Sequence, residues 1–256
     1  MRRNETTLRE DVPRPVIAFG SEYPDGHVIA PHHHRRGQLL HGSTGVVLAT
    51  TRHGTWMMPP QRGMWIPPGV VHEVQMMGEV RMRSLYFAPE AIHGMPERCQ
   101  VVGISALMAS LLAEAVALPA EYELDGRDGA LMTLIQHEMR HLPSLPLSLP
   151  MPASPALAAR CRRFLRSPTP HDTIDGWREA LGLSRRSFTR LFRRETGLSF
   201  VAWRQQACLM AALPRLAAGQ PVTTIAIDLG YDNPAAFTTM FKRVLGASPR
   251  AYLRVS

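Results

Sequence analysis

Two kinds of hydrophobic patterning divide the chain. Up to about residue 88, short runs of β-branched and aromatic residues are broken by Gly and Pro, as in GVVLATTRHGTWMMPPQRGMWIPPGVVHEV. This pattern predicts several short strands joined by turns, in a barrel or sandwich. From Val102 to Leu142 apolar residues recur at helical spacing, which predicts two helices. The chain after residue 154 is predicted to form consecutive short helices.

Residues 143–154, PSLPLSLPMPAS, separate the last two regions. Because proline lacks an amide N–H, we expect neither a helix nor a sheet ladder through this segment, and we interpret it as an extended linker. The predicted fold class is therefore α+β. It comprises a β-barrel over residues 1–100, a helical region over 101–142, and an all-α domain over 155–256.

The all-α domain contains a repeat at an offset of 49 residues, SFTRLFRRETGLS at 187–199 and AFTTMFKRVLGAS at 236–248. Each copy follows a short apolar-periodic segment and a glycine, Gly182 or Gly230. A helix, a turn at glycine and a second helix together form a helix-turn-helix motif, so we predict two such units. Ser184 and Asn233-Pro234 are predicted to start the second helices, and Pro214 to kink or end the helix between the units.

The two second helices differ on the face opposite their apolar stripe. The first presents arginines, which form bidentate contacts with guanine and with phosphate, and the second presents small residues. We expect the first to read bases through Arg186 and Arg190 and the second to read less sequence; a merely solvated polar face is the alternative. The predicted DNA-contacting residues are Arg185, Arg186, Thr189, Arg190, Arg193, Arg194, Ala235, Thr238, Thr239, Lys242 and Arg243.

The charge distribution supports a polyanionic partner for the C-terminal half. Residues 155–256 contain sixteen Lys or Arg against six Asp or Glu, whereas residues 1–154 contain thirteen against fifteen. No apolar run approaches the roughly 20 residues of a membrane span, so we expect no membrane partner. Cys99, Cys161 and Cys208 are far apart, which suggests buried thiols in a reducing cytoplasm.

Three motifs in residues 155–256 are LGLSRRSFTRLFRRETGLS, WRQQACLMAAL and IAIDLGYDNPAAFTTMFKRVLGASPRAYL. They resemble the C-terminal domain of AraC/XylS-type transcription regulators. The resemblance implies a sequence-specific regulator of double-stranded DNA with an N-terminal sensing or dimerising domain. We therefore expect a homodimer, with residues 101–142 as its dimerisation region, and RNA polymerase as a further candidate partner.

The N-terminal half contains a candidate pocket motif, APHHHRRGQLLHGSTG followed by PPGVVH. Strand alternation sends His32 and His34 to one face and His33 to the other. The spacing resembles the cupin pattern H-x-H followed later by P-x-G-x-x-H, with Gln38 where cupin metalloenzymes usually have glutamate. The candidate effector-pocket residues are His32, His34, Gln38, Trp65 and His72.

Three neutral imidazoles bind zinc, nickel, iron or copper, so His32, His34 and His72 are a candidate site for a divalent transition metal, with Gln38 as an additional ligand. The alternative is a metal-free pocket for an organic effector. His33 and His41 are interpreted as bystanders, and His137 and His141 as surface residues.

HHHRRGQLL and WMMPPQRGMWIPPGVVHEV resemble a cupin-sensor subgroup of AraC regulators that includes regulators of neighbouring efflux genes, such as those for nitroimidazole resistance. The resemblance implies a small-molecule or metal effector and control of a neighbouring transporter gene. The alternative is a cupin metalloenzyme, a dioxygenase or isomerase, with an accessory DNA-binding domain. Gln38 and the lack of an obvious acid–base pair argue against this, so we expect no enzymatic activity and no catalytic residues.

Overall fold

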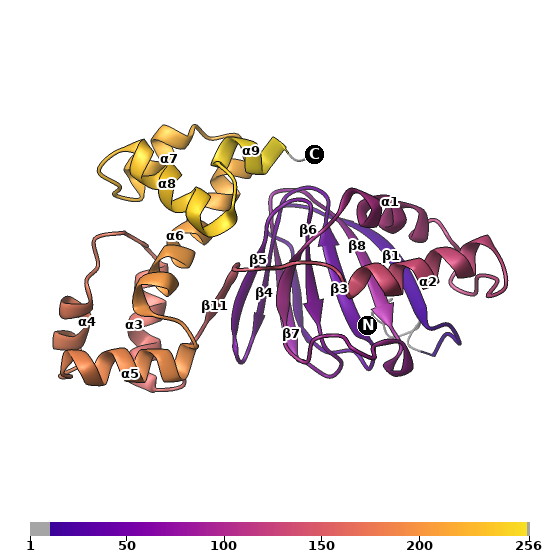
Figure 1. The fold of residues 1–256 in the computed structure, drawn as a ribbon, viewed down its shortest axis with the longest axis horizontal. Coiled ribbons are helices and arrows are strands. Elements are labelled where there is room, and N and C mark those ends of the chain that lie inside the picture. Colours follow the sequence, from indigo (N-terminus) through magenta and orange to yellow (C-terminus); the bar gives the residue numbers. More distant parts are fainter. Residues whose placement is uncertain (1–10, 255–256) are drawn as a thin grey trace. The chain divides into compact units, whose positions relative to one another are not determined.

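The computed structural model describes residues 11–254, and the chain divides into two compact units (Figure 1). The first unit comprises the chain up to residue 52 together with residues 56–145, and it is built mainly of strands. The second comprises residues 53–55 and the chain from residue 146, and it is built mainly of helices. The predicted α+β class with a helical C-terminal domain is confirmed.

The strands form two antiparallel sheets. One has six strands in the order β1-β8-β3-β6-β9-β10, and the other has five in the order β11-β5-β4-β7-β2. Their bounds are β1 Val16–Tyr23, β2 Val28–His32, β3 Gly37–Gly42, β4 Val46–Thr51, β5 Gly54–Met58, β6 Arg62–Ile66, β7 His72–Met77, β8 Val80–Phe87, β9 Gln100–Gly103, β10 Ser144–Leu145 and β11 Ser148–Pro150.

The six-stranded sheet has two buried faces, separated by the alternation of side chains along β3. Leu39 lies in register with Trp65 on β6 and Leu85 on β8, and all three belong to one buried apolar cluster. Gln38, the preceding residue, lines a cavity between the two sheets. One strand therefore lines both the apolar core and the polar space between the two sheets. We call the first of the two compact units the barrel unit, after its predicted fold.

Helices α1 (Ala106–Ala115) and α2 (Arg127–Met139) cover the apolar face of this sheet. Met108 and Leu112 of α1 and Met132 and Ile135 of α2 belong to the same buried cluster as Trp65. The prediction that the helical region starts at about residue 101 is wrong in detail. Val101 and Val102 belong to β9, because they pair with Met64 and Gly63 of β6, and the first helix begins four residues later.

The proline-rich segment 143–154 differs from its prediction. Ser144 and Leu145 pair with Val102 and Val101, so a short sheet ladder does form between two prolines. Leu147 and Leu149 are fully buried, and β11 lies at the edge of the five-stranded sheet. Proline is tolerated at strand ends and sheet edges, which is why two- and three-residue strands persist here.

The helical unit contains the two predicted helix-turn-helix pairs. Its helices are α3 Pro155–Leu165, α4 Ile174–Ala180, α5 Arg185–Thr196, α6 Phe200–Ala217, α7 Val222–Asp228, α8 Pro234–Leu245 and α9 Pro249–Arg254. The pairs are α4–α5 and α7–α8. The side chains of Ser184 and Asn233 accept hydrogen bonds from the backbone N–H of Ser187 and Ala236, as predicted. Pro214 does not end α6, which continues to Ala217.

An aromatic cluster holds the first helix-turn-helix pair together. The indole of Trp177 on α4 lies 6.4 Å from the ring of Phe188 and 6.3 Å from that of Phe192, both on α5. It also lies 4.8 Å from the ring of Phe200 at the start of α6. The position of α5 is therefore set by its buried aromatic face, which leaves the opposite face free for other contacts.

We predict that Gly37→Ala destabilises the barrel by about 1–3 kcal/mol, the usual cost of overpacking a core. A Cβ at Gly37 would lie 2.3 Å from Cη2 of Trp65, inside the buried cluster. Gly20→Ala on β1 is the matched control, because its Cβ would meet only Val116 at ordinary contact distance, 3.8 Å. Urea unfolding of both variants checks this, and equal midpoints would contradict it.

Candidate nucleic-acid interface and effector cavity

The outward face of α5 is a stripe of basic side chains. Arg186, Thr189, Arg190 and Arg193 are exposed, while Phe188 and Phe192 on the other face are buried. With Arg185, these exposed residues line an open surface hollow of about 600 Å³. The structure thus brings together the residues that the sequence assigned to this stripe, which we call the arginine stripe.

Ion pairs distinguish the arginines of α5. Arg185 pairs with Asp175 at 3.2 Å, and Arg194 pairs with Glu195 at 3.4 Å. Within residues 11–254, Arg186, Arg190 and Arg193 have no acidic partner within 4 Å. These three guanidinium groups are therefore available for an anionic partner.

The equivalent face of α8 has a different chemistry. Ala235 and Thr239 are exposed, Thr238 is half-buried, and the cations Lys242 and Arg243 are exposed in the last turn. The two helices share buried aromatic residues at matching positions, but the central part of the α8 face carries no charge. The two helix-turn-helix units are therefore alike in packing and unlike in surface.

Glu195, near the end of α5, ties this helix to the start of α3. Its carboxylate accepts hydrogen bonds from the backbone N–H of Ser154, at 2.9 Å, and from the Ser154 hydroxyl. Ser154 lies at the N-cap position of α3, but its side chain bonds to Glu195 and makes no cap. Burial raises the pKa of Glu195, but the hydrogen bonds from Ser154 and the neighbouring Arg194 guanidinium lower it, and the pKa is lowered overall.

The barrel unit contains a cavity of about 1030 Å³ between its two sheets. It is lined by residues of β1, β2, β3, β7 and β8 and by Val116 and Leu118, which follow α1. None of the lining residues is Asp, Glu, Lys or Arg. Aromatic walls come from Phe19, Tyr23 and Tyr86, so the cavity suits an uncharged guest.

Three histidines cluster beside this cavity. His32 on β2 pairs in register with His72 on β7, and His34 lies just beyond the end of β2. Their ring centroids lie 4.3–5.5 Å apart, and one nitrogen from each ring lies within 4.8 Å of the others. His32 also lines the cavity. The cluster therefore has an open side toward the cavity.

Hydrogen bonds fix the tautomers of two of these rings. Nδ1 of His32 lies 2.8 Å from the carbonyl oxygen of Ala30, and Nδ1 of His72 lies 2.9 Å from that of Val70. Because a carbonyl oxygen only accepts, both Nδ1 atoms carry the proton and both Nε2 atoms keep a lone pair. Nε2 of His72 is buried with no hydrogen-bond partner.

Burial keeps two imidazoles of the cluster uncharged. Loss of solvation, followed by the neighbouring imidazoles, lowers the pKa of His34 to about 3. Burial also lowers the pKa of His72 to about 4. Both rings are thus neutral near pH 7, the form in which histidine binds metals and accepts hydrogen bonds.

Gln38 completes the polar end of the barrel. Its Nε2 donates to the hydroxyl of Tyr86 at 3.0 Å, while its Oε1 is buried without a hydrogen-bond partner. A buried acceptor with no donor is costly, so this oxygen is available to a ligand or a water molecule. Gln38 Oε1 and His72 Nε2 together provide lone pairs that the protein itself leaves unused.

The prediction that Trp65 lines the pocket is wrong. Trp65 lies on the opposite face of the six-stranded sheet, 1% exposed, with its Nε1 donating to the carbonyl of Pro96 at 2.7 Å. Its neighbour in register is Leu39 rather than Gln38, so strand alternation directs it away from the cavity. Conversely, Ser84 and Tyr86 of β8 line the cavity. The sequence signal for these two pocket residues is the strand VRMRSLYF, in which Ser84 and Tyr86 are two positions apart and therefore share one face.

The remaining histidines lie outside the cluster. His33, His137 and His141 are exposed, as expected. His41 is also outside the cluster but is not a surface residue. It is 2% exposed, its Nδ1 lies 3.0 Å from the carbonyl of Arg62, and burial lowers its pKa to about 4.

Comparison with known protein families also assigns separate domains to the two halves of the chain. The AraC-like ligand binding domain matches residues 14–137, and a helix-turn-helix domain matches residues 177–254. The HTH-type transcriptional regulator NimR of Escherichia coli K12 is 33% identical over 222 residues, covering 87% of this chain and 81% of that protein. This chain belongs to the AraC-type transcription regulators.

Two solved structures are among those similar to this chain. ToxT from Vibrio cholerae matches 94% of this chain and 98% of its own, at 10% identity and a TM-score of 0.39. The DNA-binding domain of AdpA, in complex with a target DNA, matches 39% of this chain and 91% of its own, at 29% identity and a TM-score of 0.36.

The predicted function, a DNA-binding regulator with an N-terminal ligand-binding domain, is confirmed. The expectation that the chain is not an enzyme agrees with its relatives, which are regulators, and the metalloenzyme alternative has no support. Within residues 11–254, no helix is long and apolar enough to cross a bilayer.

We predict that Glu195→Gln lowers the free energy of unfolding by about 1–2 kcal/mol at pH 7, because it weakens charge-assisted hydrogen bonds from Ser154. Glu179→Gln, at a carboxyl that is 67% exposed, should change it by less than about 0.5 kcal/mol.

The difference between wild type and Glu195→Gln should depend on pH. The folded pKa of Glu195 lies below its ordinary value of 4.5, so its contribution is complete above pH 4.5 and is lost as pH falls through the folded pKa. Urea unfolding at pH 7 and at acid pH checks this; a difference that grows on acidification would contradict it.

Proposed function

We propose that the regulator binds DNA chiefly through the arginine stripe of α5, with α8 contributing phosphate contacts and little base reading. Support comes from the three guanidinium groups of Arg186, Arg190 and Arg193, which have no acidic partner within the described residues. Arg186 and Arg190 are one turn apart, so both can reach the edges of neighbouring base pairs. Lys242 and Arg243 suit phosphates, which set affinity and salt dependence.

The remaining predicted contacts follow the same division. In α5, Thr189 lies between the reading arginines, and Arg185 and Arg194 are held by ion pairs near the edges of the stripe. In α8, the methyl groups of Ala235, Thr238 and Thr239 suit contact with thymine methyls. Two such helices about one helical turn of DNA apart enter successive major grooves.

Arg190→Gln and Lys242→Gln should affect DNA binding in different ways. Arg190→Gln should weaken binding to the operator by about 10–100-fold and relax base preference at one position. Lys242→Gln should weaken specific and non-specific binding alike and reduce the salt slope by about one. Fluorescence anisotropy with operator and scrambled duplexes at several salt concentrations measures both. Identical behaviour of the two variants would contradict the assignment.

We further propose that the barrel cavity binds the effector and that this effector is uncharged. The observation that carries this is a cavity of about 1030 Å³ without a single Asp, Glu, Lys or Arg in its lining. Without a metal in the adjacent histidine cluster, an ionic guest would lose its hydration there and meet no counter-charge. Val116 and Leu118 line the cavity directly after α1, so an occupant touches the helical region and can shift α1 and α2.

The histidine cluster fits a divalent transition metal. His32, His34 and His72 would be the ligands, with Oε1 of Gln38 as a further donor, because lone pairs on His72 and Gln38 are buried and unused. Neutral imidazoles suit zinc, nickel, copper or iron, and the backbone carbonyls that hold Nδ1 would orient the ligating rings. When bound, such a metal would offer a coordination position to a guest in the cavity.

Metal titration of protein purified without an affinity tag tests this site. We expect about one equivalent of zinc to bind wild type. His72→Ala should weaken binding by at least about a hundredfold, and Gln38→Glu should strengthen it by about tenfold, because a carboxylate compensates the metal charge. His33→Ala is the matched control, since His33 is exposed beside the cluster. Equal zinc affinity in His72→Ala and His33→Ala would contradict the metal and favour a metal-free pocket.

The biological setting follows from the family resemblance. We propose that the regulator acts in the cytoplasm as a homodimer, with contacts through the region of α1 and α2, and controls a neighbouring transporter or efflux gene. NimR, 33% identical and named an HTH-type transcriptional regulator, supports the regulatory role in this proposal. Exposed Leu107 on α1 and Leu134 on α2 suit a helical dimer contact, and RNA polymerase is a further partner of a regulator bound at a promoter.

A further inference from the structure

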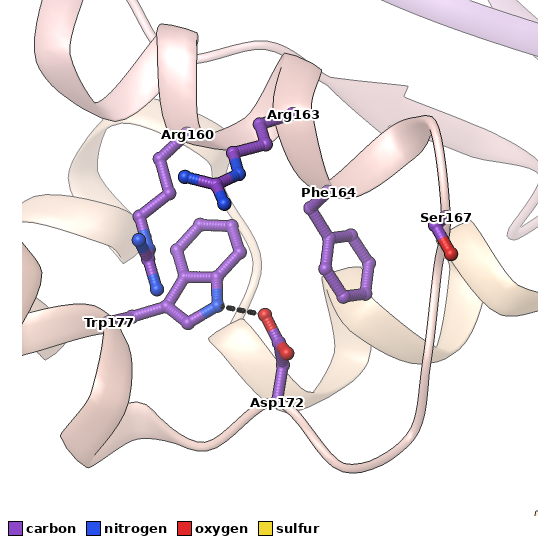
Figure 2. A pocket seen from close by; sticks show the side chains of 6 residues that line it. All are labelled: Arg160, Arg163, Phe164, Ser167, Asp172 and Trp177. Carbon is purple, nitrogen blue, oxygen red and sulfur yellow. Dashed lines mark hydrogen bonds between the residues drawn. The ribbon is translucent and has the colours of Figure 1, made fainter. Parts of the chain in front are cut away.

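A second cavity, of about 290 Å³, lies within the helical unit between α3 and the segment that leads into α4 (Figure 2). Its lining residues are Arg160, Arg163, Phe164, Ser167, Asp172 and Trp177. No residue of α5 lines it, so it is separate from the arginine stripe. We propose that this cavity is a ligand site for a small aromatic monocarboxylate.

Two guanidinium groups supply the positive charge of this cavity. Arg160 and Arg163 are three residues apart on α3, and Figure 2 shows both side chains extending to the indole of Trp177. Cζ of Arg160 lies 4.9 Å from the indole centroid, and its Nε is buried with no hydrogen-bond partner. Within residues 11–254, neither arginine has a carboxylate within 4 Å. A carboxylate matches such a pair of donors.

Asp172 limits the charge of the ligand. One of its carboxylate oxygens accepts the indole N–H of Trp177 at 2.6 Å, and its backbone carbonyl accepts from Arg204. One carboxylate beside two guanidinium groups leaves a single positive charge in the lining. A monoanion balances that charge, with its carboxylate at the arginine end and away from Asp172.

The aromatic residues that line the cavity favour a ligand with an aromatic ring over a simple inorganic anion. The rings of Phe164 and Trp177 meet edge to face at 5.7 Å, and both border the cavity. Because Phe164 is 6% exposed and Trp177 1% exposed, only the edges of these rings border the cavity; an aromatic group would pack against these edges, whereas inorganic phosphate would make no apolar contact. Trp177 also contacts Phe188 and Phe192, so an occupant lies one side chain from the helix that carries the arginine stripe.

Nuclear magnetic resonance of the full chain with ¹⁵N-labelled tryptophan tests the proposal directly. The indole signal of Trp177, assigned with Trp177→Phe, should shift saturably with benzoate and not with the neutral analogue benzamide. The signals of Trp56 and Trp65 in the barrel unit should stay in place. Arg163→Gln should raise the dissociation constant for benzoate by about tenfold, the loss of one charge-assisted contact.

Arg166→Gln is the matched control, because Arg166 is an exposed arginine next to α3 that does not line the cavity. It should bind benzoate like wild type, and thermal melting should show that both variants fold. The proposal is overturned if millimolar benzoate leaves the Trp177 signal unmoved, or if Arg163→Gln and Arg166→Gln bind alike. It is equally overturned if benzamide or inorganic phosphate titrates the signal as well as benzoate does.

Discussion

The alternation of side chains along β3 is the constraint on which the structure of the barrel unit depends. Because successive residues of a strand face opposite sides, Gln38 enters the space between the sheets while Leu39 enters the apolar cluster under α1 and α2. A register slip of one residue would bury Gln38 among leucines and place Leu39 beside the histidines. Trp65, packed over Gly37 and in register with Leu39, stabilises the observed register. The polar pocket therefore exists because the opposite face of the same strand is tightly packed.

The same separation of faces organises the helical unit. Phe188 and Phe192 hold α5 against Trp177. On the other face, Arg186, Arg190 and Arg193 have no acidic partner among residues 11–254. The second helix-turn-helix pair keeps the aromatic pattern with Phe237 and Phe241, but the central part of the outer face of α8 carries no charge. Packing is thus duplicated, whereas surface chemistry is not. On this difference we base the proposal that the two helix-turn-helix pairs read DNA unequally.

The sequence predicted the features that depend on local pattern. Caps at Ser184 and Asn233, the repeated aromatic residues and the alternation that exposes His33 all follow from short-range spacing. Features that depend on distant partners were missed. The side of the sheet taken by Trp65 follows from its register with Leu39, and the strand at Ser144 follows from its pairing with Val102. A proline-rich segment has no strand signal of its own, and only its neighbour makes it a strand.

Selection of binding sites from a random DNA library by the full-length protein tests the central claim of unequal reading most directly. The account predicts one strongly selected segment with guanines at fixed positions, matched to the arginines of α5, and a second segment about one helical turn away with weak base preference. Two equally strong segments, or selection concentrated in the segment that α8 contacts, would contradict it.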